Sequence, residues 1–345
     1  MMLKNSKIGC FSDIHLGIYH DDKTWHDIIL KFAKWASDFY KKNNIKDIFI
    51  PGDIFHNRNE IGVETLHIAK QFFDYFKDFN VYISAGNHDS FLKHESIINS
   101  ISIFDGWNNI KIIDKECLTV NTENKKICFV PWGTPIDEIP NCDIIFGHFE
   151  INSFYMNNYK VCEKGINSSD LFKKSKFIIS GHFHKKDFRE YKNGKILYVG
   201  SPYQQNFGDV LDERGIYIID LDTENYVFYK NNISPEHIKI NISDLVENKI
   251  DETKINKNII KLIIDKNIDH DKIISYKDNV FKKTPLIFKT EYQISEDLNT
   301  NISTDQFSFD ENNFLKDIEE YLNKTDIEHK KEVVEYLKEL YNSLV

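Results

Sequence analysis

Short apolar runs alternate with amphipathic stretches along roughly the first 230 residues. The apolar runs are rich in β-branched and aromatic side chains, which predicts buried strands. We predict strands at Lys7–Phe11, Asp47–Pro51, Val81–Ala85, Ile127–Pro131, Asp143–Phe146, Phe177–Ser180, Ile196–Val199 and Ile216–Leu221. Apolar residues recur at helical spacing at Ile28, Ile29, Phe32, Ala36 and Phe39, and again at Leu66, Ala69, Phe72, Phe73 and Phe76. This alternation indicates an α/β domain, residues 1–232, in which helices cover sheets.

The remainder of the chain divides into three segments. Residues 233–293 contain strand-like runs at Ile238–Ile242, Asn258–Ile264 and Pro285–Tyr292 and helical pieces at Asp244–Val246 and Asp271–Phe281, which predicts a small α+β accessory domain. Residues 294–312 are polar, as is typical of a flexible linker. Residues 313–345 carry two apolar stripes at helical spacing. Two short helices cannot bury both stripes alone, so we expect this helical pair to dock on a partner.

Composition and charge place the chain among ordinary globular proteins. Its 345 residues are 41% apolar and carry no apolar run long enough to span a membrane or to act as an export signal, so we expect a cytoplasmic protein (host cytoplasm if phage-encoded). The five cysteines form no C-x-x-C pair and are interpreted as reduced thiols. Net charge is −10, yet residues 151–200 hold ten basic and four acidic residues, a local +6. A phosphate backbone could approach there, although a solvated lysine-rich loop would have the same composition.

Five polar clusters follow one another in the chain, each at the end of a predicted strand. They are Asp13-Ile14-His15, Gly52-Asp53, Gly86-Asn87-His88-Asp89, Gly147-His148 and Gly181-His182-Phe183-His184. Sites in α/β sheets lie at the carboxyl ends of strands, so a sheet could gather these side chains into one pocket. A lone Gly-Asp or Gly-His usually marks a turn, but five such clusters in this order are not expected by chance.

The side chains in these clusters are typical of a site for two divalent metals. Asp53 can span two ions, and Asn87 offers a neutral oxygen. Asp13, His15, His148, His182 and His184 complete two mixed nitrogen and oxygen shells. Two ions roughly 3.5–4 Å apart can activate a shared water and stabilise a phosphoryl group under attack. The ligand set suits manganese, iron, zinc or cobalt, and affinity order alone does not choose among them.

Three further residues, two of them in these clusters and one just after a cluster, are candidates for catalysis. His88 could hydrogen-bond the scissile phosphate or protonate the leaving oxygen, since imidazole titrates near neutral pH. Asp89, its neighbour, is predicted to orient the His88 ring. His56 could line the substrate side of the pocket. The other histidines are expected at the surface or at helix caps.

These motifs resemble the calcineurin-like metallophosphoesterase superfamily, and within it the SbcD-type nucleases of double-strand-break repair and recombination, in their compact phage version. Gly52-Asp53-Ile54-Phe55-His56 resembles the second motif of that branch, and the segment from Tyr198 to Gly208 resembles its segment after the last histidines. The resemblance covers residues 7–222 well. It implies a four-layer β-sandwich flanked by helices, with a capping domain and a terminal helical pair.

The resemblance also implies roles. One metal would take Asp13, His15, Asp53 and His184, and the other Asp53, Asn87, His148 and His182, with His88 as the catalytic histidine. The implied metal is Mn²⁺, and the implied activity is double-strand exonuclease and single-strand endonuclease. The implied partners are DNA, at double-stranded ends or as single strands, an SbcC-type ABC ATPase bound through residues 313–345, and a second copy in a homodimer. The capping domain, residues 233–293, would help to place DNA.

Two other classes of function remain open from the sequence. A phosphatase or small-molecule phosphodiesterase of the same superfamily could use the same ligands. Phosphatases of this kind carry an arginine four positions after the bridging aspartate, where this chain has Asn57. A non-catalytic adaptor of the ATPase is disfavoured because every expected ligand is present.

Overall fold

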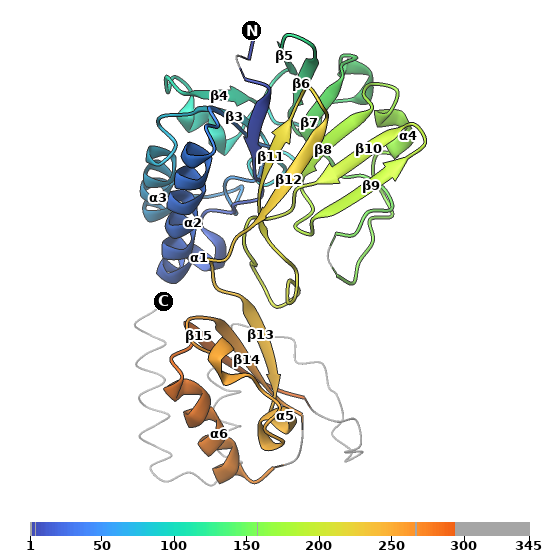
Figure 1. Ribbon diagram of the computed structural model, residues 1–345. Coiled ribbons are helices and arrows are strands. Elements are labelled where there is room, and N and C mark those ends of the chain that lie inside the picture. Colours follow the sequence, from blue (N-terminus) through green and yellow to red (C-terminus); the bar gives the residue numbers. More distant parts are fainter. Residues whose placement is uncertain (1, 4, 157, 266–267, 294–345) are drawn as a thin grey trace, which may run out of the picture. The chain divides into compact units, whose positions relative to one another are not determined.

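Two six-stranded sheets and one three-stranded sheet form the part of the chain that the computed structural model describes, residues 2–3, 5–156, 158–265 and 268–293 (Figure 1). The first sheet has the order β12-β11-β1-β2-β3-β4, made of β1 (Lys7–Cys10), β2 (Asp47–Ile50), β3 (Asn80–Ser84), β4 (Ile110–Ile113), β11 (Gly215–Asp220) and β12 (Asn225–Lys230). Strands β1 to β4 run parallel, while β11 and β12 join antiparallel beside β1. The carboxyl ends of the parallel strands β1 to β4 therefore meet at one edge of the sheet.

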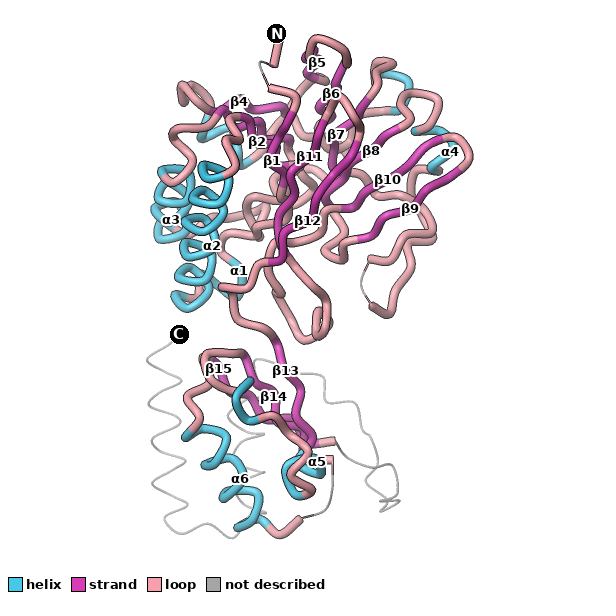
Figure 2. Tube along the Cα trace, viewed as in Figure 1, coloured by secondary structure: helices cyan, strands magenta, loops and turns pink. Residues whose placement is uncertain are grey.

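The second sheet also has four parallel strands at its centre. Its order is β5-β6-β7-β8-β10-β9, made of β5 (Leu118–Asn121), β6 (Lys126–Val130), β7 (Ile144–His148), β8 (Phe177–Gly181), β9 (Asp187–Tyr191) and β10 (Gly194–Tyr198). Strands β6, β7, β8 and β10 are parallel, and β5 and β9 close the two edges antiparallel. Figure 2 shows the strands of both sheets as magenta segments within the upper part of the chain.

The two large sheets pack against each other through a shared core. Phe49 of β2, Tyr82 of β3, Phe129 of β6, Phe146 of β7 and Tyr217 of β11 are all fully or almost fully buried in this cluster. The rings of Phe49 and Phe129 are 4.6 Å apart, and those of Phe49 and Phe146 are 5.0 Å apart. Ring contacts of this kind favour a fixed arrangement of the sheets over a loosely packed one.

Two long helices cover the outer face of the first sheet (Figure 1). They are α2 (Lys23–Lys42) and α3 (Val63–Asp74). The Asp22 carboxylate caps α2 by accepting hydrogen bonds from the backbone N–H groups of Thr24 and Trp25. Along β2, Ile48 and Ile50 face these helices whereas Phe49 faces the other sheet, because side chains alternate along a strand.

The outer face of the second sheet is covered by a mostly irregular segment, residues 149–156 and 158–172. Phe149, Ile151 and Phe154 of this segment are buried there. Its one short helix is α4 (Ser168–Leu171). Residues that favour turns, such as Asn152, Ser153 and Gly165, explain why no long helix forms in this segment.

The third sheet comprises β13 (His237–Asn241), β14 (Ile259–Ile264) and β15 (Ile287–Tyr292), all parallel. Helices α5 (Ile242–Val246) and α6 (His270–Lys282) accompany it, with a core of its own that includes Ile240, Leu262, Ile273 and Val280. Its elements are those predicted for the accessory domain. The domain boundary at residue 233 stays a prediction, and the linker 294–312 and helical pair 313–345 lie outside the described residues.

All eight strands predicted for the first domain are present, shifted by a residue or two. Four strands were not predicted: β4, β5, β9 and β12. These are the four edge strands of the two large sheets. None of the helices in the described residues is long and apolar enough to cross a membrane.

Candidate metal centre

The seven predicted ligands lie where strands of both large sheets end. Asp13 and His15 follow β1, Asp53 follows β2 and Asn87 follows β3. His148 is the last residue of β7, and His182 and His184 come directly after β8. Parallel neighbours end at the same edge, so the two sheets bring the seven side chains together.

Within this cluster two groups of side chains could each hold an ion. Ligand atoms of Asp13, His15 and His184 lie within 4.8 Å of one another, and so do those of Asp53, His148 and His182. The Asp53 Oδ2 atom lies 3.7 Å from Nε2 of His15 and 3.4 Å from Nε2 of His148. Asp53 therefore stands between the two groups, as a bridging carboxylate would.

Asn87 joins the second group through its amide oxygen. Oδ1 of Asn87 lies 2.7 Å from Nδ1 of His182 and 3.0 Å from Nε2 of His148. In the first group, Nε2 of His15 lies 3.0 Å from Nε2 of His184. Nitrogen and oxygen donors that converge with no thiolate among them fit divalent ions of the manganese to zinc series.

The backbone at four of these residues is left-handed. The φ angle is +58° at Asp13, +53° at His15, +55° at Asp53 and +88° at His182. Such angles are uncommon for residues with a side chain and cost of order 1 kcal/mol each. Strain of this kind clusters at functional sites, where the surrounding structure holds it in place.

Glycines allow the ligand loops to approach one another closely. A Cβ atom on Gly86 would lie 2.2 Å from Oδ1 of Asp53 and 2.4 Å from its backbone nitrogen. A Cβ atom on Gly52 would lie 2.6 Å from Nδ1 of His148, and Gly52 itself has a φ of +96°. Both positions therefore require glycine.

Charges within the centre shift the pKa values of its members in opposite directions. Burial lowers the pKa of His148, but the Asp53 carboxylate raises it more, to about 9. Burial raises the pKa of Asp53, but the charge and hydrogen bond of His148 hold it well below its usual range. Burial, followed by the charge of His148, lowers the pKa of His182 to about 3. A neutral imidazole is the form that binds metals.

Burial dominates at the remaining members of the first group. It raises the pKa of Asp13, against the charge of His148. It lowers the pKa of His15 well below its usual value and, with less effect, that of His184. These two histidines are therefore neutral near pH 7, with lone pairs available as ligands.

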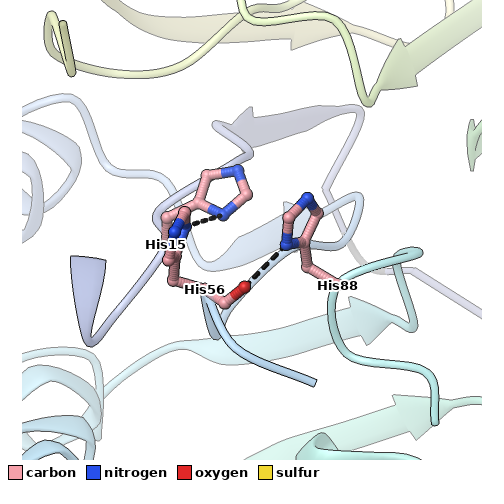
Figure 3. Close-up of side chains that lie close together, drawn as sticks. All are labelled: His15, His56 and His88. Atoms are coloured by element: carbon pink, nitrogen blue, oxygen red, sulfur yellow. Dashed lines mark hydrogen bonds between the residues drawn. The ribbon is translucent and has the colours of Figure 1, made fainter. Parts of the chain in front are cut away.

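His88 and His56 lie beside His15 in a third group of close side chains (Figure 3). The Nδ1–H group of His88 donates to the backbone carbonyl of His56 at 2.6 Å, which leaves Nε2 of His88 to exchange a proton. Nδ1 of His56 lies 3.4 Å from Nδ1 of His15. His56 thus contacts a candidate ligand, and it also lines a cavity beside the centre. Its place on the substrate side stays a prediction.

Asp89 does not orient the His88 ring, so that prediction is wrong. The Asp89 carboxylate is buried and accepts three backbone N–H bonds, from Ile54 and Phe55 at Oδ1 and from Gly86 at Oδ2, each 3.0 Å long. Burial, with the Asp53 charge, raises the pKa of Asp89 to about 7. Asp89 joins the loop after β2 to the loop after β3, and the carbonyl of His56 orients His88 instead.

Several residues around the centre were not singled out from the sequence. The Trp132 ring, which follows β6, lies 5.2 Å from the ring of His182 and 5.7 Å from that of His148. Gln205 donates to the backbone carbonyl of Asp13 at 2.7 Å, and its own backbone N–H donates to Asp209, which is paired with buried Arg214 at 2.8 Å. An aromatic residue at a strand end was a signal available for Trp132. Gln205 lies in the segment from Tyr198 to Gly208 that resembles the family, but no role of its own was predicted for it from the sequence.

Two histidines expected at the surface are buried instead. His26 is 2% exposed and His237 is 3% exposed. His26 lies 3.1 Å from the Thr65 hydroxyl, and His237 packs between the rings of Trp25 and Phe207. All five cysteines are free thiols, as predicted.

Comparisons with known proteins show which proteins this chain is similar to. A family model described as calcineurin-like phosphoesterase matches residues 6–186. Exonuclease subunit 1 of Enterobacteria phage T4 is 29% identical over 303 residues, which cover 84% of this chain and 86% of that protein. A putative phosphoesterase, 078R, of Invertebrate iridescent virus 3 is 23% identical over 220 residues, 58% of this chain and 60% of that protein. A dimetal phosphatase from Danio rerio aligns with a TM-score of 0.40 and 10% identity, over 62% of this chain and 92% of that one.

Proposed function

The chain belongs to the calcineurin-like phosphoesterase family, and we propose that it is the nuclease subunit of a DNA repair or recombination complex. Its α/β sandwich of two sheets is the metallophosphoesterase architecture. The proposal rests on two candidate ligand groups that meet at Asp53, in a chain that is 29% identical to an exonuclease subunit over 84% of its length. The proposed reactions are exonuclease cleavage at double-stranded ends and endonuclease cleavage of single strands.

The donor set fits a pair of divalent ions, proposed to be Mn²⁺. Asp13, His15 and His184 would hold one ion and Asn87, His148 and His182 the other, with Asp53 between them. When bound, such ions polarise a phosphoryl oxygen and make water a stronger nucleophile near neutral pH.

Residues of the chain would position the substrate and move its proton. His88 keeps Nδ1–H on the His56 carbonyl, so its Nε2 atom can carry a proton to the departing oxygen. His56 faces Nδ1 of His15 and favours the tautomer of His15 whose Nε2 is free to act as a ligand. Trp132 packs against His148 and His182 and limits the access of water to them.

A variant of His88 tests this proposal. Full-length protein with Mn²⁺ should release nucleotides from linear double-stranded DNA, and His88→Ala should lower that rate by about 10²–10⁴-fold. The matched control is His67→Ala, on the surface of α3, which should cleave at the wild-type rate. Equal rates for His88→Ala and the wild type would remove His88 from the mechanism.

The principal alternative is a small-molecule phosphodiesterase of the same family. A cavity of about 780 Å³ beside His184 is large enough for such a substrate. The alternative predicts hydrolysis of bis(p-nitrophenyl) phosphate without cleavage of DNA. A non-catalytic adaptor predicts neither reaction, even with the ATPase supplied.

We also propose that two further surfaces bind proteins. Residues 313–345 would bind an ABC-type ATPase, so deletion of 312–345 should abolish its co-purification and spare cleavage of short DNA. A homodimer would bury the exposed apolar side chains of Val63, Phe91, Ile97 and Ile98. Sedimentation of Ile98→Asp as a monomer would support the dimer, whereas a monomeric wild type would contradict it.

A further inference from the structure

Two cavities open beside the candidate metal centre, and carboxylates line both: Asp21 and Glu60 in one, and Asp209, which is paired with Arg214, in the other. The larger, about 780 Å³, is lined by the loop after β1 and the loop after β2, including Tyr19, Asp21, His56 and Glu60. We call it the acidic cavity. The smaller, about 240 Å³, is lined by Met156, Tyr159, His182 and Phe183 among others. His184 and Asn206 line both, so the cavities meet at a candidate metal ligand.

The fixed charge in the lining of the acidic cavity comes from two carboxylates. Asp21 and Glu60 contribute carboxylates to its wall, beside three histidines. No lysine or arginine is among the described residues that line it, but the Lys289 ammonium lies over the ring of its wall residue Tyr19 at 5.5 Å. Leu16, Ile18 and Ile61 give it apolar surface, and Asn57 and Gln205 supply polar groups. Such a lining suits an uncharged group with a flat apolar ring and hydrogen-bonding edges.

Positive charge lies beyond the smaller cavity. Lys185, the residue after His184, donates to Asn158 at 2.7 Å and lies over the ring of Tyr155. Arg189 lies over the ring of Phe154 at 4.0 Å. Both belong to residues 151–200, whose net charge is +6. Basic side chains interleaved with aromatic rings are typical of surfaces that follow a nucleic-acid strand.

The wall of the acidic cavity is built under backbone strain. Tyr19, His20 and Asp21 are three consecutive residues with left-handed φ angles of +57°, +56° and +61°. Non-glycine residues adopt this conformation singly, not in runs. The Thr65 hydroxyl donates to Asp21 at 2.6 Å and the Tyr19 hydroxyl donates to the carbonyl of Gln205 at 2.7 Å, and these bonds hold the run in place.

We infer that the acidic cavity receives the terminal nucleoside of a strand whose scissile phosphate lies at the metal centre, and that it rejects ends that carry a phosphate. The remainder of the strand leaves over the basic side. A terminal phosphate would bring about two negative charges towards Asp21 and Glu60. This inference rests on the proposed nuclease function and adds a preference among strand ends.

The test compares four blunt-ended DNA duplexes of one sequence, with hydroxyl or phosphate at the 5′ or at the 3′ ends. For the wild type and each variant, the rate at which the full-length protein releases the first nucleotide is divided by its rate of hydrolysis of bis(p-nitrophenyl) phosphate. At one polarity, wild type should favour the hydroxyl end about fivefold, as expected for exposed charge pairs. Glu60→Gln should reduce this ratio to about twofold, and Glu60→Lys should remove it. Exposed Glu123, on the turn after β5, provides the control Glu123→Gln, which should keep the full ratio.

A binding measurement separates this inference from the nuclease proposal. Calorimetry on metal-free protein should detect binding of deoxyadenosine, and binding of deoxyadenosine monophosphate should be weaker. Glu60→Lys should reduce this difference in affinity between the two ligands. If the protein binds deoxyadenosine in this way but does not cleave DNA, the proposed nuclease function is refuted, whereas the proposed binding of a nucleoside in the acidic cavity is retained. No end preference at either polarity, or one equal in wild type and both Glu60 variants, would overturn the inference.

Discussion

Asp89 offers the sharpest test of how the centre is held together. Its carboxylate is the common acceptor for the N–H groups of Ile54, Phe55 and Gly86, and so fixes the loop with Asp53 to the loop with Asn87. Asp89→Asn keeps the shape of the side chain but replaces one oxygen with an NH₂ group. That group would face a backbone donor whichever way the amide turns.

The cost of Asp89→Asn can be worked from these bonds. The best orientation keeps Oδ1 on Ile54 and Phe55 and sets Nδ2 against the N–H group of Gly86, which loses one bond to a charged acceptor in a buried place. Such a loss costs about 2–3 kcal/mol. At roughly 2–4 °C per kcal/mol for a domain of this size, the Tm should fall by about 5–10 °C. Asp89→Ala leaves three donors unsatisfied and should cost at least about 4 kcal/mol.

Urea unfolding and thermal melts would measure the loss of stability in the two Asp89 variants. They should be run at pH 8.5, because the pKa of Asp89 is about 7 and its carboxylate is ionised at that pH. Mn²⁺ affinity should fall in the same order, from wild type to asparagine to alanine. Asp74→Asn is the control, since Asp74 is an exposed partner of Lys70 at 2.9 Å and such a pair contributes under about 1 kcal/mol. Wild-type stability in Asp89→Asn would refute the reasoning.

Three other predictions follow from the site and its surroundings. Gly86→Ala should lower Mn²⁺ affinity at least about tenfold in calorimetry, because its Cβ would lie 2.2 Å from the Asp53 carboxylate. In the control Gly106→Ala the new Cβ meets nothing within 4 Å, so the only cost is the strain of a left-handed backbone at alanine. Equal Mn²⁺ affinity in both variants would contradict this prediction. Burial lowers the pKa of His237 to about 4, so the unfolded chain binds more protons than the folded chain between pH 6.5 and 4. The free energy of unfolding should therefore drop by about 3 kcal/mol as pH falls through that window. His237→Phe should flatten this pH dependence in urea titrations, and an unchanged pH dependence in the variant would contradict the prediction. Mn²⁺ at about 100 times its Kd should raise the free energy of unfolding by about 2.7 kcal/mol over EDTA-treated protein, and identical melts would count against ion binding.

The interior strands could be predicted from the sequence, whereas the edge strands could not. Each interior strand of the two large sheets is an almost unbroken apolar run, such as Ile144–His148. The edge strands β9 (Asp187–Tyr191) and β12 (Asn225–Lys230) mix charged or polar residues with aromatic ones, and none of their residues is buried. Their pairing depends on a neighbouring strand that no local pattern identifies.

The candidate site divides in a similar way. The convergence of Asp13, Asp53 and His148 followed from their positions at strand ends, because the sheet decides where strand ends meet. The role of Asp89 did not follow, since adjacency to His88 in the chain says nothing about which way a side chain points in a tight loop. Two of its three partners, Ile54 and Phe55, are more than thirty residues away in sequence.

The left-handed backbone at Asp13, His15, Asp53 and His182 has a consequence for attempts to engineer this protein. Glycine at any of these positions would relieve about 1 kcal/mol of strain while deleting a ligand. A library screened for heat resistance alone would therefore enrich chains that have lost the centre. Selection for thermostable variants should therefore include a measurement of metal binding as well as a measurement of heat resistance.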